Sequence, residues 1–306
     1  MQTAKVKAYA KINLTLDITG SKDGYHLLDS FVASVDLYDL ITAKKRKDKL
    51  VRVIMRGLDA DQIPYANNNA QRAGEAFVKI FQTTGAEIVV DRNIPVGGGL
   101  GGSSADTAGV LNAMAKLYGF EKDERLKQIA DMLGSDTGYM LSGGFARLNG
   151  RGEVVKSVPV GGLSTMYLLL ICPQTSVSSG GCYKRYDERK DEYIPKTNDC
   201  ITAFLNGDLQ GVCDNFSNAL YLPSADLNPD TAIAVQEAKA FSPTGANMTG
   251  SGSSAYAVFE TKELRDWAKS RYRGKFRTFC TQTVDPNKKK KGWKNPFALS
   301  KDEITK

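Results

Sequence analysis

A loop almost without side chains joins a strand-like run to a helix-like run about a third of the way along the chain. Residues 95–108 read PVGGGLGGSSADTA, with five glycines among the six positions 97–102. Glycine lacks a Cβ, so such residues reach positive φ and can turn successive amide N–H groups toward one point. The run before the loop, EIVVDRNIPV, is rich in β-branched residues and fits a strand that leaves a sheet. The segment therefore predicts a loop that binds an anion, a phosphate above all, through its backbone.

A helix is expected directly after the glycines. Ser103 or Ser104 is a suitable N-cap, and apolar residues recur at helical spacing from Val110 to Tyr118 before Gly119 ends the run. The N-terminus of a helix offers unpaired N–H groups and the positive end of the helix dipole. The helix start is thus expected to strengthen anion binding by the loop.

The spacing of residues around the glycines distinguishes between the known types of phosphate-binding loop. A Walker A loop needs a lysine after its last glycine, whereas Gly102 is followed by two serines. A dinucleotide site of the G-x-G-x-x-G type needs a further strand ending in an acid about 20 residues on, but residues 121–133 read EKDERLKQIADML, which favours a helix. A glycine-rich hairpin without a ligand is the remaining alternative, and a strand before and a helix after the loop speak against it.

Three motifs in this order resemble those of the GHMP kinases, which are named for galactokinase, homoserine, mevalonate and phosphomevalonate kinases. The glycine loop fits P-x-G-x-G-L-G-x-S-S-A over residues 95–105. It is preceded by AYAKINLTL at 8–16 with DGYH at 23–26, and followed by GANMTGSGSS at 245–254. The resemblance runs from about residue 7 to residue 259, most of the chain.

The resemblance implies transfer of a phosphoryl group from ATP to an alcohol. Mg²⁺ is expected with ATP, because phosphoryl transfer uses it, but the sequence assigns no metal ligand. The implied ATP-binding residues are the glycine loop and one helix start, namely Pro95, Val96, Gly97, Gly98, Gly99, Leu100, Gly101, Gly102, Ser103, Ser104, Ala105 and Asn68.

Two residues are implied in catalysis, Lys11 and Asp136. Apolar residues alternate through 8–16, so Lys11 is expected to share the opposite face of a strand with Asn13. Taken alone, a lysine on a strand and an acid in a turn are ordinary surface residues. By resemblance, Asp136 accepts the proton of the substrate hydroxyl and Lys11 holds its carboxylate in place.

The DGYH motif is similar to that of family members whose substrate is a small alcohol carrying cytidine diphosphate, phosphorylated on its 2-hydroxyl during isoprenoid precursor synthesis. By resemblance, Tyr25 stacks on cytosine, His26 binds the edge of the base, and Tyr183 covers the other face. Asn13 and Asp136 are implied near the reactive end of this substrate.

Two alternatives stay open. One is another small-molecule kinase of the family, of the homoserine or mevalonate type. It is disfavoured by the implied cytosine-binding residues, Tyr25, His26 and Tyr183. The other is a weakly active paralogue that binds nucleotide. It is motivated by Thr137 and Gly138 in place of the usual Val-Pro, and by Ala219 and Tyr221 in place of two acids.

Composition fits a globular enzyme of the cytoplasm. The chain has 306 residues, of which 42% are hydrophobic, and no apolar run approaches the ~20 residues that cross a bilayer. Its five cysteines show no C-x-x-C spacing, so they are expected to be reduced. The net charge is +7, and residues 285–306 alone carry seven lysines against three acids. We therefore expect no nucleic-acid or membrane partner, and a monomer or homodimer.

The expected fold class is α+β, because strands and helices are grouped rather than strictly alternating. By resemblance, residues 1–160 form an ATP-binding domain like domain 2 of ribosomal protein S5. Residues 161–285 form a ferredoxin-like domain, and 286–306 a flexible basic tail. Strands are expected at 5–17, 31–43, 50–55, 87–96, 145–148, 166–171, 255–259 and 278–284, and helices near 68–82, 104–118, 121–133, 200–206, 208–220, 229–240 and 262–270.

Overall fold

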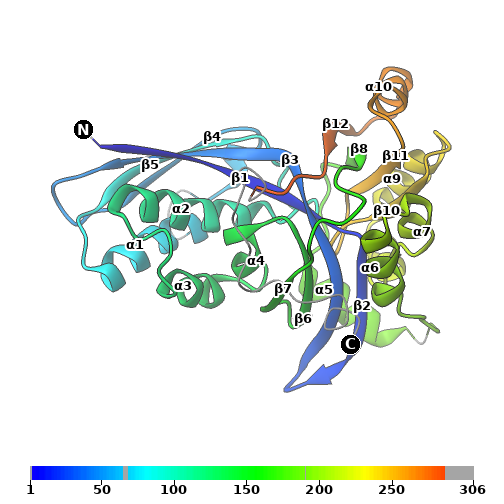
Figure 1. Cartoon of the computed structure of the whole chain (residues 1–306), viewed down its shortest axis with the longest axis horizontal. Coiled ribbons are helices and arrows are strands. Elements are labelled where there is room, and N and C mark those ends of the chain that lie inside the picture. The colour runs from blue at the N-terminus through cyan, green and yellow to red at the C-terminus, as the bar shows by residue number, and fades with distance from the viewer. Residues whose placement is uncertain (1, 65–67, 190, 287–306) are drawn as a thin grey trace. The chain divides into compact units, whose positions relative to one another are not determined.

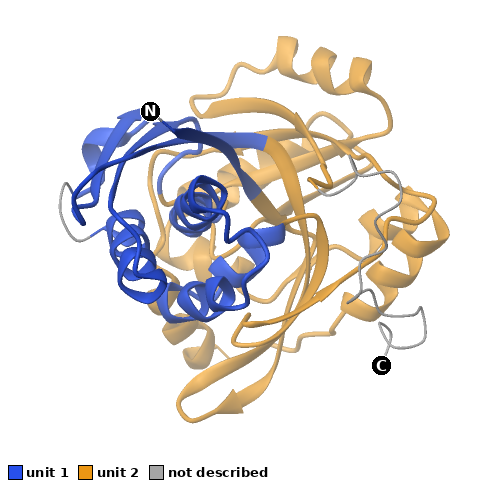
Figure 2. Ribbon diagram, turned by 60° about the vertical axis from the view of Figure 1, so that its left-hand side comes forward, with its two compact units in different colours: residues 1–10, 37–96, 101–142 blue, residues 11–36, 97–100, 143–306 orange. Residues whose placement is uncertain are grey.

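The computed structural model describes residues 2–64, 68–189 and 191–286 (Figure 1). Its mixed sheets and helices confirm the α+β class. The chain forms two compact units (Figure 2), unit 1 from residues 1–10, 37–96 and 101–142 and unit 2 from residues 11–36, 97–100 and 143–306. The chain passes from one unit to the other within two strands, within the glycine loop and between residues 142 and 143. The domain boundary at residue 161 stays a prediction, and the basic tail from residue 287 lies outside the described residues.

Unit 1 combines strands with a group of helices. Its strands are parts of β1 (Thr3–Asn13) and β3 (Tyr25–Lys45), together with β4 (Arg52–Gly57) and β5 (Ala86–Arg92). β5 pairs antiparallel with β3 and parallel with β4. The helices are α1 (Asn69–Phe81), α2 (Gly102–Tyr118), α3 (Arg125–Leu133) and α4 (Thr137–Ser142), with a short 3-10 helix η1 (Ala60–Gln62).

Unit 2 contains a second, four-stranded sheet in the order β10 (Gly245–Met248), β11 (Ala255–Phe259), β8 (Tyr167–Cys172) and β12 (Arg277–Gln282), all antiparallel. It also holds β2 (Thr15–Lys22), β6 (Phe145–Gly150), β7 (Val154–Ser157) and the short β9 (Ser217–Asn218). Its helices are α5 (Ser179–Glu188), α6 (Thr197–Asn206), α7 (Leu209–Asp214), α8 (Tyr221–Leu227), α9 (Pro229–Lys239) and α10 (Lys262–Arg271).

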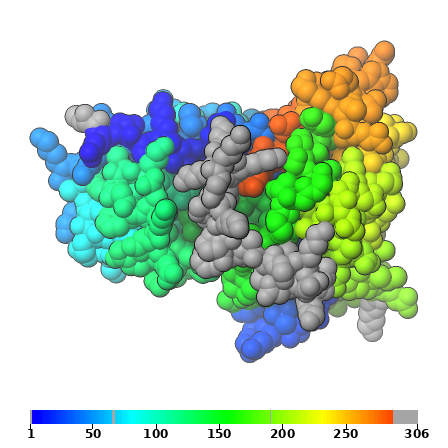
Figure 3. All heavy atoms as spheres, in the orientation of Figure 1, coloured from blue at the N-terminus to red at the C-terminus, as the bar shows by residue number. Residues whose placement is uncertain are grey.

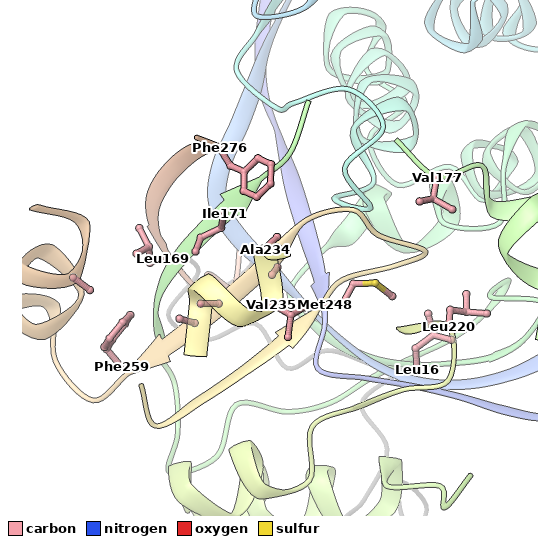
Figure 4. Packing of buried hydrophobic residues seen from close by; sticks show 14 of the residues in the cluster. Leu16, Leu169, Ile171, Val177, Leu220, Ala234, Val235, Met248, Phe259 and Phe276 are labelled. Carbon is pink, nitrogen blue, oxygen red and sulfur yellow. The ribbon is translucent and has the colours of Figure 1, made fainter. Parts of the chain in front are cut away.

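The core of unit 2 lies between the four-stranded sheet and the helices beside it (Figure 4). Leu169 and Ile171 of β8 are fully buried with Ala234 of α9 and Met248 of β10. The leucine, isoleucine and methionine side chains each contribute about 1.5–3 kcal/mol by leaving water. α10 stands at the surface, orange in Figure 3, and contacts the sheet through its buried Ala268. This packing anchors β10 and β11, the two strands that residues 249–254 connect.

Most predicted elements are confirmed, with altered ends. The strand expected at 5–17 breaks at Leu14 into β1 and β2, and the one expected to reach residue 96 ends at Arg92. The helix expected over 121–133 begins only at Arg125, because the Asp123 carboxylate accepts the amide and the guanidinium of Arg125 and closes a turn before it.

The helix expected over 208–220 is confirmed over Leu209–Asp214 and is wrong beyond Asp214. α7 ends at Asp214, and the chain then pairs with β2, Thr15 opposite Ser217 and Leu16 opposite Asn218. Asparagine, phenylalanine and serine are weak helix formers, so residues 215–218 give up the helix for pairing with β2. Helix α5 was not expected from the sequence. Its start contains Gly180 and Gly181, and Ser178 caps it by accepting the amide of Gly181.

Candidate active site

The glycine loop needs glycine at its centre. Gly97 and Gly99 have φ of 71° and 75°, in the left-handed region. A Cβ on Gly99 would lie 2.1 Å from the carbonyl oxygen of Thr249, closer than any two such atoms approach. The bare backbone at this point therefore allows the loop to lie directly on the segment between β10 and β11.

Hydrogen bonds hold the loop on that segment. Thr249 Oγ1 donates to the carbonyl of Gly99 at 3.2 Å, and the amide of Ser254 donates to the carbonyl of Gly98 at 3.3 Å. These bonds use carbonyls of the loop, so they orient the chain without consuming its amides. Two motifs about 150 residues apart in sequence thus form one structure.

Lys11 and Asn13 lie beside this loop, and the prediction that they share a strand face is confirmed. Lys11 Nζ donates to Asn13 Oδ1 at 2.5 Å, and the Lys11 amide donates to the carbonyl of Leu100 at 3.0 Å. Asn13 Oδ1 also accepts the amide of Gly250 at 3.0 Å. Both side chains are about 95% buried, at 5% and 4% exposure, which is costly for an ammonium and unusual outside a functional site.

Asn218 is a supporting residue that the sequence analysis missed. Its Nδ2 donates to the carbonyls of Met248 and Gly250 at 3.1 and 3.0 Å, and so fixes the segment on which the glycine loop lies. The neighbouring Ala219 is buried and Tyr221 packs against the core of unit 2. Nothing in the sequence near Asn218 signals this bond, because its partners lie about 30 residues away.

The start of α2 differs from the prediction. Its N-cap is Gly101, in the left-handed region at φ 73°, and not Ser103 or Ser104. The chain turns at a glycine straight into the helix, so both serines lie inside the first turn, and no described side chain caps this helix. The first intrahelical bond runs from the Ala105 amide to the carbonyl of Gly101. First-turn amides without a side-chain cap suit an anionic ligand.

Asn68 begins α1, as expected. As N-cap it accepts the amide of Gln71 at 2.9 Å and donates to the carbonyl of Pro64 at 3.0 Å. Its neighbour Asn69 donates to Ser103 Oγ at 3.4 Å, which links the starts of α1 and α2. The contact of Asn68 with adenine stays a prediction.

Asp136 stands immediately before α4, where its carbonyl accepts the amide of Met140 at 3.0 Å. At Gly138, one of the departures from the family pattern, a Cβ would lie 2.7 Å from Oδ1 of Asp131 on α3, the end of a flexible side chain that can move aside. Asp136 belongs to unit 1 and Lys11 to unit 2, so their approach stays a prediction.

The expected base-binding residues lie partly together. The rings of His26 on β3 and Tyr183 on α5 stack with centroids 4.8 Å apart and an interplanar angle of 17°. Tyr186 meets the edge of His26, with centroids 5.8 Å apart. Tyr25 is 56% exposed and lies under the guanidinium of Arg151, 4.6 Å from its ring centroid. Unit 2 thus offers stacked aromatic groups from two elements.

A buried charged cluster supports the chain that enters the glycine loop. Arg92 donates to Asp106 Oδ2 at 3.1 Å and to the carbonyl of Ile94 at 2.8 Å. Asp39 Oδ1 accepts the amides of Asn93 and Ile94. Burial, with a smaller contribution from the nearby Asp39, raises the pKa of Asp106 well above its usual range, against the opposing effect of Arg92.

We expect Asp106→Asn to remove part of the pH dependence of stability. The folded state binds this proton more tightly than the unfolded chain, so its contribution to stability falls as pH rises from the unfolded pKa of about 3.9 toward the raised folded value. Asparagine needs no proton. As pH rises through that window, the free energy of unfolding of the variant should increase relative to that of the wild type by up to about 1.4 kcal/mol per pH unit. Urea unfolding between pH 4.5 and 7.5 checks this, and parallel pH profiles would contradict it.

No metal centre or membrane helix is evident in the described part of the chain. No group of three or more His, Cys, Asp or Glu side chains gathers there in a way that could hold a metal ion. None of its helices is long and apolar enough to span a bilayer.

Comparisons with known proteins agree with this site. The models for the GHMP kinases N terminal domain and the GHMP kinases C terminal match residues 68–146 and 200–278. A curated 4-diphosphocytidyl-2-C-methyl-D-erythritol kinase from Clostridium beijerinckii is 32% identical over 92% of this chain and all of its own length. The enzyme of the same name from Clostridium kluyveri is 33% identical over 91% of this chain and 99% of its own.

Solved structures show the same fold. A crystal structure of 4-(cytidine 5'-diphospho)-2C-methyl-D-erythritol kinase superposes with a TM-score of 0.76 at 26% identity, covering 91% of this chain and 98% of that one. A homoserine kinase from Cytophaga hutchinsonii gives 0.72 at 18% identity, over 93% and 95% of the two chains, which shows the fold alone. The relatives above 30% identity span nearly the whole chain and both domain models match in order, so the chain belongs to the GHMP kinases.

Proposed function

We propose that this protein transfers the γ-phosphoryl group of ATP to the 2-hydroxyl of 4-diphosphocytidyl-2-C-methyl-D-erythritol, a step in isoprenoid precursor synthesis. The relatives that carry this enzyme's name cover nine-tenths of the chain. The observation that carries the ATP part is the glycine loop bound to the 249–254 segment. The stacked His26 and Tyr183 carry the cytidine part, since flat rings and a polar edge suit a pyrimidine.

The proposed reaction uses few protein groups. The loop amides and the start of α2 bind the phosphates of ATP and orient the γ-phosphorus. Asp136 accepts the proton of the 2-hydroxyl as that oxygen bonds to phosphorus and ADP leaves, while the ammonium of Lys11 offsets developing negative charge. Asn13, bonded to Lys11, orients the substrate near this point.

Mg²⁺ is proposed as a companion of ATP. In nucleotide sites Mg²⁺ usually keeps several waters and is held by the substrate phosphates with one or two carboxylates. Neutralising charge on the β and γ phosphates is the chemistry that the ion supplies when bound. The cytoplasmic location, the monomer or homodimer, and the lack of nucleic-acid and membrane partners stay predictions from the sequence.

A coupled assay of ADP release tests the proposal. The cytidylyl substrate, homoserine and mevalonate are supplied in turn with ATP and Mg²⁺, and we expect turnover with the first alone. Turnover with homoserine or mevalonate would favour another small-molecule kinase. ATP binding without turnover of any alcohol would favour a nucleotide-binding paralogue, for which Thr137 and Gly138 are the motivating departures.

His26→Ala is expected to separate the two substrates. Loss of the ring removes the proposed hydrogen bond to the edge of the base and leaves the donor of the base unpaired, which costs about 1–3 kcal/mol, or about 5–100-fold in KM for the cytidylyl substrate. KM for ATP should stay within about twofold, because ATP binds the loop instead. Steady-state kinetics with each substrate varied in turn gives both values, and equal changes would refute base recognition by His26.

A further inference from the structure

The imidazole of His26 has a carboxylate partner that no motif indicated. Nε2 of His26 lies 2.7 Å from Oδ1 of Asp187, one turn after Tyr183 on α5. The His26 side chain is 16% exposed and the Asp187 side chain 61%. An ionised carboxylate only accepts hydrogen bonds, so Nε2 carries the hydrogen of this pair. In a neutral imidazole the other nitrogen, Nδ1, then has no hydrogen and acts as an acceptor.

Further contacts fix the plane of this ring. Tyr183 stacks on it and Tyr186 meets its edge at an interplanar angle of 87°. All of these groups come from α5, so one helix determines both the plane of the imidazole and its rotation about the Cβ–Cγ bond. A flip of the ring would break the bond to Asp187 and exchange the acceptor nitrogen for a carbon.

Cytosine and uracil differ in the exocyclic group that could hydrogen-bond to Nδ1 of His26. Cytosine presents an exocyclic amino group, which donates, where uracil presents a carbonyl oxygen, which accepts. A neutral imidazole with its hydrogen on Nε2 can accept a hydrogen bond from the cytosine amino group through Nδ1. The uracil carbonyl oxygen has no hydrogen to donate, so its lone pairs would face the lone pair of Nδ1 and the two atoms would repel. A site built around one hydrogen bond rejects an analogue that cannot form it, because its own buried group is left unpaired.

We propose that Asp187 is a positioning residue that holds His26 in the Nε2–H tautomer and thereby selects an amino-bearing pyrimidine, cytosine over uracil, at this site. This inference rests on the proposed function. Asp187 does not touch the base. It acts through the imidazole, so its effect is confined to discrimination between bases.

The kinetic test compares the cytidylyl substrate with its uridylyl counterpart at pH 8.5, in the full-length protein with ATP and Mg²⁺. We expect Asp187→Ala to reduce the ratio of kcat/KM for the two substrates by about 10-fold or more, the scale of one hydrogen bond. The change should fall on KM for the cytidylyl substrate, with kcat and KM for ATP unaltered. Glu188→Gln is the matched control, because this neighbouring carboxylate pairs with Arg185 and not with His26.

A second readout needs no activity. His26 is the only histidine in the chain, so nitrogen-15 NMR of the imidazole reports this one side chain. We expect the wild type and Glu188→Gln to show the Nε2–H tautomer, and Asp187→Ala to show a mixture of tautomers. An unchanged substrate ratio in Asp187→Ala, or a wild-type ring with its hydrogen on Nδ1, would overturn the inference. If the wild type did not turn over the cytidylyl substrate, the proposed function would be wrong instead. The NMR spectrum would still show which nitrogen of His26 carries the hydrogen.

Discussion

Asp136→Asn is expected to lower kcat by about 10²–10⁴-fold, the usual contribution of a positioned general base. Asparagine has nearly the shape of aspartate but cannot take up the proton of the 2-hydroxyl. The carbonyl of residue 136, which accepts the Met140 amide at the start of α4, is unaffected by this change, so the fold should persist. KM for ATP should therefore stay near its wild-type value, because the glycine loop is untouched.

Asp131→Asn is the matched control for this prediction. Asp131 lies in the same unit and makes an exposed i,i+4 pair with Lys127 at 2.5 Å. Such pairs stabilise a helix by only about 0.3–0.5 kcal/mol, so the control should keep nearly full activity. Single-turnover kinetics at saturating ATP measures the chemical step directly. If Asp136→Asn retained wild-type turnover, the proton would go to another acceptor and the assignment of Asp136 would be wrong.

Gly99→Ala is expected to have the second large effect, on ATP binding. The left-handed backbone at φ 75° costs alanine about 1–2 kcal/mol. Its Cβ would also lie 2.1 Å from the Thr249 carbonyl oxygen, so the loop must move off its support. Overpacking of this kind costs about a further 1–3 kcal/mol. Movement of the loop misdirects its amides, and we expect KM for ATP to rise by about 100-fold or more, the scale of that free energy.

Gly119→Ala separates the two causes. Gly119 has nearly the same backbone conformation, φ 80°, but a Cβ there meets nothing within 4 Å. It ends α2 away from the loop, so alanine should cost only the conformational strain, about 1–2 kcal/mol, without a change in KM for ATP. Thermal unfolding and ATP-dependent kinetics on both variants provide the comparison. Equal KM values in the two variants would show that contact with Thr249 does not position the loop.

The hydrophobic pattern was sufficient for much of the local structure. Alternation from Ala8 to Leu16 correctly placed Lys11 and Asn13 on one strand face, and glycine at position 119 correctly ended α2. The pattern failed where distant segments compete with local preference. After Asp214 the chain leaves its helix and pairs with β2. Helix α5 could not be predicted because its first turn contains two glycines, which are poor helix formers, and its start is stabilised by the cap that Ser178 provides.

For the candidate site too, some features could be predicted from the sequence and others could not. Glycine content, together with the order of three motifs, determined from the sequence alone that this chain has the loop of a phosphate-transferring enzyme and which family it resembles. Only the tertiary structure decided which atoms hold that loop and which partner His26 has. Thr249 and Asp187 are polar residues about 150 and 160 positions from the groups that they contact, at Gly99 and His26. Periodicity reports the burial of neighbours along the chain, whereas such pairs arise only when folding brings remote segments within hydrogen-bond distance.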